Sequence, residues 1–281
     1  MLFLIFTFYS YFIDKNGIQY RCYFYRCIKR KRRDRMDAIF DREAFLTALR
    51  RCFDASGLNE YLKDGKEERY AFLCERLFEE NKRYNLTAIK DAPRAAYLHF
   101  CDSVSIAPLI PENARLLDVG CGGGFPSLPL AIARPDVKIT AMDATEKKVA
   151  YVSESARLLG LSNVVAVSAR AEEAATGKMR ESFDVVTARA VAALPVLSEL
   201  CLPFVRVGGT FFAMKGAGAE EETNAARHAF SFLGGDLVSV TPLTVLGGEE
   251  TQSRFAVTVR KVEKTPVGYP RHFSKISKKP L

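Results

Sequence analysis

The chain has no Cys-x-x-Cys pair, although seven cysteines are scattered through its 281 residues. Their spacing suggests neither a disulfide framework nor a zinc site, and a reduced, cytoplasmic compartment is expected. The sequence also has no biased repeat and no apolar run of the roughly 20 residues that a membrane-spanning helix needs. These absences argue against a disulfide-stapled secreted domain and a helical membrane protein. The composition is otherwise globular, and the chain is long enough to bury a substantial core.

Positive charge is concentrated at the two ends of the chain. The formal net charge is +8, and residues 1–35 carry +7 from nine Lys/Arg and two Asp. Residues 254–281 carry another +7 from eight Lys/Arg and one Glu, which leaves the part between, residues 36–253, at −6. We therefore expect a functional basic surface at the C-terminal end and not over the whole molecule.

Residues 1–35 differ in composition from the rest of the chain. An apolar and aromatic stretch, Met1 to Ile13, precedes a strongly basic one, Arg21 to Arg35. The apolar stretch is too short to cross a bilayer, and a signal peptide would carry its positive charge before the apolar run. We expect an upstream, non-native extension, either disordered or the result of a mispredicted start, with Met36 as the first residue. A membrane-surface anchor is the alternative.

Two amphipathic helices are predicted after this extension. Apolar residues recur at helical spacing from Ile39 to Phe53 and again from about Glu67 to Phe78. These helices are expected to belong to a small N-terminal cap, residues 36–112, and to have no chemistry of their own.

A further helix is predicted from Arg94 to about Ser105. His99 and Asp102 lie three residues apart and so share a face of this helix. Because no third ligand is nearby, a hydrogen-bonded structural pair is favoured over a catalytic or metal-binding role.

From Ala114 the sequence alternates between strands and helices. This rhythm predicts a doubly wound α/β sheet, residues 113–264, that ends in an antiparallel pair at one edge. Gly160 and Gly234 follow helices as left-handed caps, and Thr145 is a predicted N-cap. The basic tail, residues 265–281, shows little core-forming pattern. The expected strands are 116–119, 137–142, 164–167, 183–187, 210–214, 237–242 and 254–262, and the expected helices are 128–133, 146–159, 194–205 and 219–232.

A strand, a glycine-rich turn and a helix follow one another between Leu116 and Ala133. The turn reads Asp118-Val119-Gly120-Cys121-Gly122-Gly123-Gly124-Phe125-Pro126. Glycine lets a backbone approach a ligand closely, and the helix N-terminus that follows faces whatever binds there. The pattern therefore predicts a nucleotide pocket at the carboxyl end of the first strand.

The register of the glycines distinguishes between cofactors. A dinucleotide fingerprint G-x-G-x-x-G started at Gly120 would place glycine at Phe125. Asp118 precedes the loop and would repel a pyrophosphate, but it suits the ammonium and sulfonium of S-adenosylmethionine (AdoMet). Asp143 ends the second strand, where a carboxylate can accept both ribose hydroxyls. These features favour a methyltransferase over a dehydrogenase.

Three more groups follow the later strands. Arg170, Ala171 and Glu172 come after the third strand, where an adenine would lie. Arg189 ends the fourth strand, where the methyl group and its acceptor should meet, and it is interpreted as functional. Lys215 ends the fifth strand in a similar way, and a solvated loop lysine is an equally good interpretation.

The ordered set of motifs resembles the RsmG (GidB) family, which methylates N7 of a guanine in small-subunit ribosomal RNA. The resemblance covers about Asp41 to Leu281. After Arg271 the chain departs from the family, since His272-Phe273-Ser274 stands where the family continues through Pro and Gly. The motifs are Asn85-Leu86-Thr87, His99-x-x-Asp102-Ser103, the glycine loop, Asp143 with Lys147-Lys148, Arg170-Ala171-Glu172, Phe183-Asp184 with Arg189-Ala190, Lys215-Gly216 and Tyr269-Pro270-Arg271.

The resemblance implies a class I AdoMet-dependent methyltransferase, Rossmann-like, with a seven-stranded sheet and a small helical cap. Its cofactor would be AdoMet, and its partner the 16S rRNA, the small subunit or an assembly intermediate. A cytoplasmic monomer is expected, with no metal and no stable membrane association. By motif position Gly120, Phe125, Ala171, Glu172 and Arg189 would contact the cofactor. From the residues, Asp118, Gly122, Gly124 and Asp143 join this set, and Arg170, Lys215 and Arg271 are predicted RNA contacts.

The expected chemistry needs no general base. Guanine N7 carries a lone pair and no proton, so in-line attack on the methyl group requires mainly positioning, for which Arg189 is the candidate. A methyltransferase acting on another RNA, on a protein or on a small molecule remains an alternative, as does a non-catalytic RNA-binding protein of the same fold.

Overall fold

The computed structural model describes residues 10–13, 19–22, 40–245 and 253–281. It separates into two units, Met1–Ile39 and Phe40–Leu281. In the first unit, β1 (Ser10–Ile13) and β2 (Gln19–Cys22) pair as an antiparallel hairpin. The expected start at Met36 lies outside the described residues. None of the described helices is both long enough and apolar enough to cross a bilayer.

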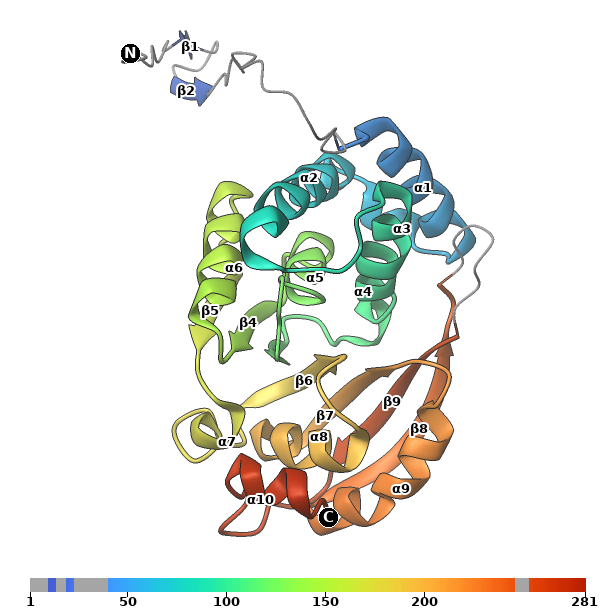
Figure 1. Cartoon of the computed structure of the whole chain (residues 1–281), viewed down its shortest axis with the longest axis vertical. Coiled ribbons are helices and arrows are strands. Elements are labelled where there is room, and N and C mark those ends of the chain that lie inside the picture. Colours follow the sequence, from blue (N-terminus) through green and yellow to red (C-terminus); the bar gives the residue numbers. More distant parts are fainter. Residues whose placement is uncertain (1–9, 14–18, 23–39, 246–252) are drawn as a thin grey trace. The chain divides into compact units, whose positions relative to one another are not determined.

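Seven described strands of the second unit form one sheet in the order β5-β4-β3-β6-β7-β9-β8 (Figure 1). The strands from β5 to β7 are parallel, while β9 runs antiparallel to both β7 and β8. The predicted doubly wound sheet with an antiparallel edge pair is therefore confirmed. The strands are β3 (Arg115–Val119), β4 (Lys138–Asp143), β5 (Val164–Ser168), β6 (Phe183–Arg189), β7 (Val205–Lys215), β8 (Gly235–Leu243) and β9 (Arg254–Lys261).

The predicted helices lie close to their expected ranges apart from one, and two short helices, residues 171–174 and 273–278, were not predicted. The helix predicted to run from Leu194 to Val205 ends at Cys201, because Pro203 lacks an amide hydrogen and a 3₁₀ turn leads directly into β7. The helices are α1 (Arg42–Ala55), α2 (Lys66–Tyr84), α3 (Ala92–Ala95), α4 (Asp102–Val104), α5 (Ser127–Ala133), α6 (Glu146–Leu158), α7 (Ala171–Ala174), α8 (Leu194–Cys201), α9 (Ala219–Phe232) and α10 (Phe273–Lys278); a π-helical segment, Ala96–Cys101, joins α3 to α4.

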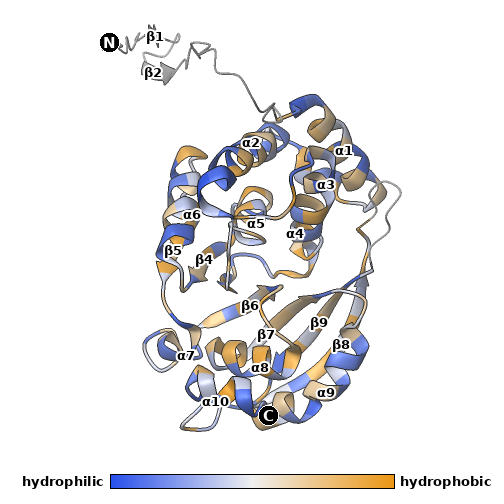
Figure 2. Ribbon diagram, viewed as in Figure 1, coloured by the Kyte–Doolittle hydropathy of each residue, from blue (hydrophilic) through white to orange (hydrophobic). Residues whose placement is uncertain are grey.

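The two faces of the sheet support two separate hydrophobic clusters. Side chains alternate along a strand, so Leu116 of β3 points into one cluster and Leu117 into the other. The first cluster contains residues of α1, α2, α5 and α6, and the second contains residues of α8, α9 and α10. Helix α8 is mainly hydrophobic (Figure 2), because it packs against the sheet and also contacts α9 and α10.

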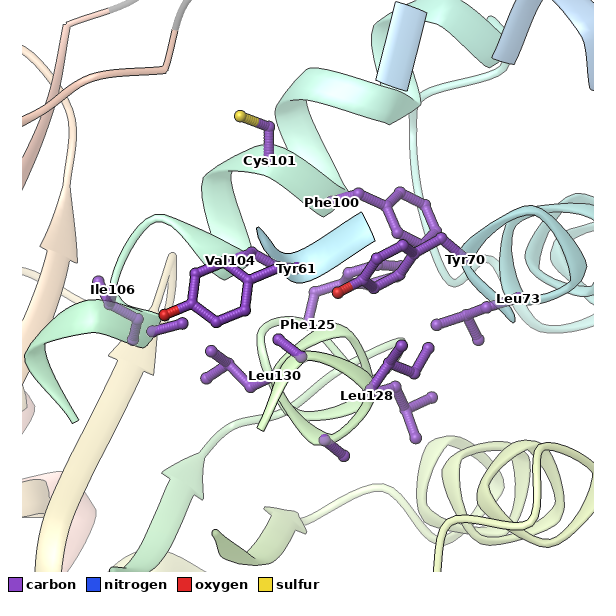
Figure 3. Close-up of a cluster of buried hydrophobic side chains, with 14 of the residues drawn as sticks. Tyr61, Tyr70, Leu73, Phe100, Cys101, Val104, Ile106, Phe125, Leu128 and Leu130 are labelled. Atoms are coloured by element: carbon purple, nitrogen blue, oxygen red, sulfur yellow. The ribbon is translucent and has the colours of Figure 1, made fainter. Parts of the chain in front are cut away.

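The helices before the sheet share the first cluster with it. Aromatic rings of α1 and α2, such as Phe45 and Tyr70, pack edge-on against Phe100. Phe100 in turn contacts Phe125 of the glycine loop with ring centroids 5.4 Å apart. Figure 3 shows Phe125 beside Phe100 and above Leu128 and Leu130 of α5. The predicted cap is thus packed directly onto the loop that follows β3.

All three predicted helix caps stand where the sequence places them. Gly160 and Gly234 have φ angles of +63° and +79°, the left-handed conformation that glycine favours. Thr145 is the N-cap of α6, as predicted, although its side chain makes no cap hydrogen bond to the helix. The backbone amide of Thr145 donates to Asp143 Oδ1 at 2.8 Å, so the strand's last carboxylate organises this turn.

The C-terminal tail is part of the core, contrary to the sequence prediction. Ile276 of α10 is fully buried in the second cluster. Arg271 Nη2 lies 2.6 Å from Oε2 of the fully buried Glu199 of α8. Arg180 donates to the carbonyls of Thr265 and Tyr269 at 2.8 and 2.6 Å. The contacts that anchor the tail join residues about 70 to 90 positions apart, so local periodicity cannot reveal them.

The Arg271–Glu199 pair should therefore be a major determinant of stability. Replacing Arg271→Met leaves a carboxylate buried without its cation, and we expect the free energy of unfolding to fall by about 3 kcal/mol. The matched control is Arg206→Met, which removes the partly exposed pair with Asp184 and should cost at most about 1 kcal/mol. Urea unfolding of both variants measures the difference. Equal losses would show that the tail is not held by this pair.

Candidate active site

The glycine loop leaves β3 in a left-handed conformation that residues with a side chain rarely adopt. Gly120 has φ +76°, and a Cβ there would meet Val191 Cγ2 at 2.7 Å. Gly124 has φ +87°, and a Cβ there would meet Leu128 Cδ1 at 2.6 Å. These glycines were predicted to make room for a ligand, but at both positions the space is taken by the chain's own side chains. Backbone shape and close packing therefore require glycine at both positions.

Asp143, the last residue of β4, braces the loop. Its Oδ2 accepts a hydrogen bond from the amide of Gly122 at 3.0 Å, and its Oδ1 accepts from Thr145. The carboxylate is half-buried and lines two neighbouring pockets. It can accept hydrogen bonds from a ligand at the point where these pockets meet.

The two pockets lie along the carboxyl ends of the parallel strands. The larger pocket has a volume of about 720 Å³, and the smaller one of about 270 Å³. Gly120, Asp143 and Val191 line both. Of the residues predicted from the sequence, the larger pocket is lined by Gly120, Gly122, Phe125, Asp143, Arg189 and Lys215, and the smaller one by Gly120, Asp143, Arg170, Ala171 and Glu172. Asp118, Gly124 and Arg271 line neither of these two pockets.

Asp118 lies behind the glycine loop and not on a pocket wall. Its side chain is fully buried, the hydroxyl of Ser127 donates to Oδ2, and Oδ1 has no hydrogen-bond partner. Burial raises the pKa of this carboxyl to about 6, against the opposing effects of Ser127 and Arg189. The predicted direct contact with a cofactor is therefore corrected. Asp118 can act on a bound cation only through its charge and through α5, whose first turn it holds.

Asp102 joins Arg189 to a second arginine. Arg189 Nη1 donates to Asp102 Oδ2 at 2.7 Å and to the carbonyl of Leu98 at 2.9 Å. Arg254, at the start of β9, places Nε 3.3 Å from Asp102 Oδ1 in an ion pair without hydrogen-bond geometry. Asp102 is 2% exposed. Two guanidinium groups share one buried carboxylate, so this wall of the larger pocket carries a surplus positive charge.

His99 contacts Arg189 but makes no hydrogen bond to Asp102, so the predicted pair is wrong. Its Nε2 lies 2.7 Å from Thr87 Oγ1, and its ring stacks on Phe125 with centroids 4.6 Å apart. Burial, followed by the charge of Arg189, lowers the pKa of His99 to about 3. The ring is therefore neutral at physiological pH. His99 belongs to the π-helical segment, a helix irregularity that is frequent at functional sites.

The three predicted RNA contacts differ in accessibility. Lys215 Nζ donates to Glu222 Oε2 and to the carbonyl of Ala192, both at 2.7 Å. Arg271 is committed to Glu199, whereas Arg170 is exposed at the rim of the smaller pocket. The structure thus gives Lys215 and Arg271 partners within the chain that the sequence did not suggest.

Arg254, Val191 and Phe273 line these pockets but were not predicted as site residues. Arg254 and Phe273 come from segments that follow the predicted nucleotide-binding units, and no local motif marks them. Val191 directly follows the Arg189-Ala190 motif. Its position just after the arginine that ends a strand could have marked it as a pocket residue. Across the described residues, no group of three or more His, Cys, Asp or Glu is arranged to hold a metal ion.

The family model for rRNA small subunit methyltransferase G matches residues 66–248. The ribosomal RNA small subunit methyltransferase G of Lactobacillus delbrueckii subsp. bulgaricus is 42% identical over 231 residues, 80% of this chain and 96% of that protein. The chain belongs to this family.

A second member of the family supports this assignment. The Geobacillus thermodenitrificans member of the family is 46% identical over 76% of this chain and 89% of its own length. Among solved structures, a SAM dependent methyltransferase from Aquifex aeolicus is 19% identical, with a TM-score of 0.47, and the match covers 61% of this chain and 94% of that one.

Two of the sequence predictions are confirmed. The sheet is the predicted seven-stranded one, and the family to which the chain belongs methylates small-subunit ribosomal RNA. The two pockets at the carboxyl ends of the strands lie where ligands bind in this type of sheet. Which residues touch the cofactor and which base is methylated go beyond what the family assignment states.

The buried carboxyl of Asp118 should leave a signature in the pH dependence of stability. Its pKa of about 6 exceeds the ordinary 3.8. Between these values the unfolded chain is ionised while the folded chain keeps its proton, so stability falls as pH rises, and it levels off above pH 6.

Asp118→Asn removes this titration. We expect the unfolding free energy of the variant, minus that of the wild-type chain, to rise by about 3 kcal/mol from pH 4 to pH 7. Urea unfolding at several pH values in this range measures the difference. Parallel profiles for the two proteins would show that Asp118 titrates normally.

Proposed function

We propose that the chain transfers the methyl group of AdoMet to N7 of one guanine in 16S ribosomal RNA. The substrate would be the free RNA, the small subunit or an assembly intermediate. The observation that supports this most is the meeting of two pockets at Asp143. AdoMet has two unlike halves, a nucleoside and an amino acid, and two joined pockets suit such a molecule.

In this proposal the nucleoside half occupies the smaller pocket. Asp143 accepts hydrogen bonds from the ribose hydroxyls, and Ala171 and Glu172 lie beside the adenine. The amino-acid half enters the larger pocket past Gly120 and Gly122. Phe125 has a 6% exposed side chain that lines this pocket. It would contact the cofactor at its edge while its ring packs between His99 and Phe100.

The acceptor base would enter the larger pocket from the side of Arg189 and Lys215. N7 needs no deprotonation, so the pocket needs no general base. Histidine and cysteine side chains often act as a general base or a nucleophile in enzymes, and this pocket contains His99 and Cys121. With a pKa of about 3, His99 accepts a proton poorly at neutral pH, and burial raises the pKa of the Cys121 thiol so that it stays protonated. Both properties fit a transfer that proceeds by alignment of the reacting atoms.

Arg189 is proposed to position the reactants. Its bonds to Asp102 and Leu98 fix the guanidinium at the pocket wall. Its side chain is 15% exposed, so part of it remains open to a bound molecule. From there it can interact with an anionic group of the cofactor or of the RNA.

Arg189→Ala should lower the single-turnover rate of methylation by about 100-fold at saturating AdoMet, because misplaced reactants lose alignment. Arg206→Ala, which removes an arginine near the start of β7, at the end of the strand opposite to Lys215, is the control and should keep the rate. A quenched-flow assay with tritiated methyl donor measures both. A wild-type rate for Arg189→Ala would refute the positioning role.

The absence of a required base also makes a prediction for pH. The single-turnover rate should be constant between pH 7 and pH 9, because His99 is already neutral and N7 carries no proton throughout this range. The same assay, run at saturating AdoMet and RNA, measures the profile. A rate that rises tenfold per pH unit would demonstrate a deprotonation step and contradict the proposal.

RNA binding is assigned to Arg170 and to the exposed lysines of the tail, with Lys215 and Arg271 acting mainly through their partners in the chain. Lys275, Lys278 and Lys279 are exposed on or next to α10. If each neutralises one phosphate, replacing all three with alanine should reduce the slope of log affinity against log salt by about two for single-stranded RNA. Filter binding over a range of salt concentrations tests this. An unchanged slope would move the RNA contact elsewhere.

Tritiated AdoMet distinguishes this function from its alternatives. The wild-type chain is incubated with 16S RNA, small subunits, transfer RNA or a metabolite extract. Label in 16S RNA or in small subunits supports the proposal. Label only in transfer RNA or in metabolites would assign another methyltransferase activity, and binding of RNA without binding of AdoMet would indicate a non-catalytic protein.

A further inference from the structure

Phe273 is a large apolar residue whose ring is left open beside the smaller pocket. It is the first residue of α10, and 42% of it is exposed. It lines the smaller pocket together with Arg170, Ala171 and Glu172, which come much earlier in the chain. A phenyl ring at the rim of a pocket gains free energy when a flat ligand covers it.

The backbone around Phe273 is held from both sides. Before it, Arg271 donates from its amide and its side chain to the buried carboxylate of Glu199, at 2.6 to 3.2 Å. After it, Ile276 is fully buried against the second cluster. Figure 1 shows α10 below α8 and close to α7, the helix that begins with Ala171. The ring is therefore presented to the pocket by a fixed segment, so little entropy is lost when a ligand covers it.

The pocket next to Phe273 has the chemistry of a nucleobase site. Its walls include the apolar side chains of Met142, Val191 and Leu200, and polar groups stand at the rim on Asp143 and Glu172. Its volume of about 270 Å³ suits a purine ring better than a whole dinucleotide. An aromatic wall and acidic acceptors fit the flat face and the exocyclic amine of adenine.

We propose that Phe273 is a further cofactor-binding residue: its ring covers the adenine of AdoMet, so that the C-terminal tail forms one wall of the nucleoside half of the site. The inference rests on the proposed placement of AdoMet. It gives the tail a second role beside RNA binding, because the helix that carries the exposed lysines would also hold a ring against the cofactor.

Packing alone does not account for Phe273. The ring belongs to neither of the two hydrophobic clusters, in contrast to Ile276 three residues later. Val267 offers a comparison in the same tail. It is 99% exposed and lines neither of the two pockets, as expected of an apolar residue without a ligand.

Calorimetric titration with AdoMet and with S-adenosylhomocysteine tests the inference. Phe273→Ala should raise the dissociation constant of both ligands about tenfold, the typical effect of losing one aromatic stacking partner. The catalytic rate at saturating AdoMet should stay within about twofold, because the ring lies away from the methyl group. Phe273→Tyr should bind like the wild-type chain, and Phe273→Leu, which keeps apolar volume but no ring, should be intermediate. Val267→Ala is the matched control and should bind normally.

The outcomes separate the two proposals. If the wild-type chain binds neither ligand, the proposed placement of AdoMet fails and the role of Phe273 fails with it. If the wild-type chain binds but Phe273→Ala binds equally well, the role of Phe273 alone is wrong. Equal weakening in Phe273→Ala and Val267→Ala would also overturn it, since the effect would then come from the tail as a whole. Urea unfolding of each variant identifies any loss of affinity that is caused by unfolding. If Phe273→Ala is unfolded, the comparison of Phe273→Leu with Phe273→Tyr decides, because weaker binding by the leucine variant alone supports the role of the ring.

Discussion

A single buried carboxylate, that of Asp102, connects three distant parts of the chain at the larger pocket. It lies at the start of α4 and pairs with Arg189 at the end of β6 and with Arg254 at the start of β9. An ionised group in such a place is costly unless it is paired, so the helical region, the parallel sheet and the antiparallel edge are held in one arrangement. The walls of the larger pocket come from these three parts.

The same arrangement sets the charge of the site. Asp102 neutralises only one of its two arginines, so the pocket wall remains cationic, while Asp143 provides an anionic edge at the junction with the smaller pocket. AdoMet has a carboxylate, a sulfonium and a ribose, and its RNA acceptor has phosphates. A pocket that is positive on one side and negative on the other can orient such a cofactor and bring an anionic acceptor to it. Asp118 contributes from beneath the loop, where burial raises its pKa against the opposing effects of Ser127 and Arg189.

Local patterns were sufficient to predict most of the fold. Period-two and period-3.6 apolar spacing located the strands and helices of the sheet, and the left-handed glycines after α6 and α9 were visible in the sequence. The glycine loop and Asp143 were also found, because they follow one another along a strand-turn-helix unit. The actual role of Asp118 was missed, since a strand-end acid looks the same whether it faces a ligand or lies behind a loop. Arg254, the Glu199–Arg271 pair and the buried α10 were missed because each depends on contacts between segments far apart in the chain. Thr145 is the N-cap that the sequence predicted, but its amide bonds to the neighbouring Asp143 carboxylate and its side chain makes no cap hydrogen bond, which the local pattern did not indicate.

The central claim is that this site methylates N7 of one guanine in 16S RNA, and its most direct test reads the modified base itself. Ribosomal RNA from a strain lacking the protein is incubated with the purified chain and AdoMet, treated with borohydride and aniline to cleave at 7-methylguanine, and read by primer extension. We predict one new stop in the 16S RNA that requires both the chain and AdoMet. Tritium incorporation from AdoMet into 16S RNA without any such stop would place the methyl group on another atom and contradict the account.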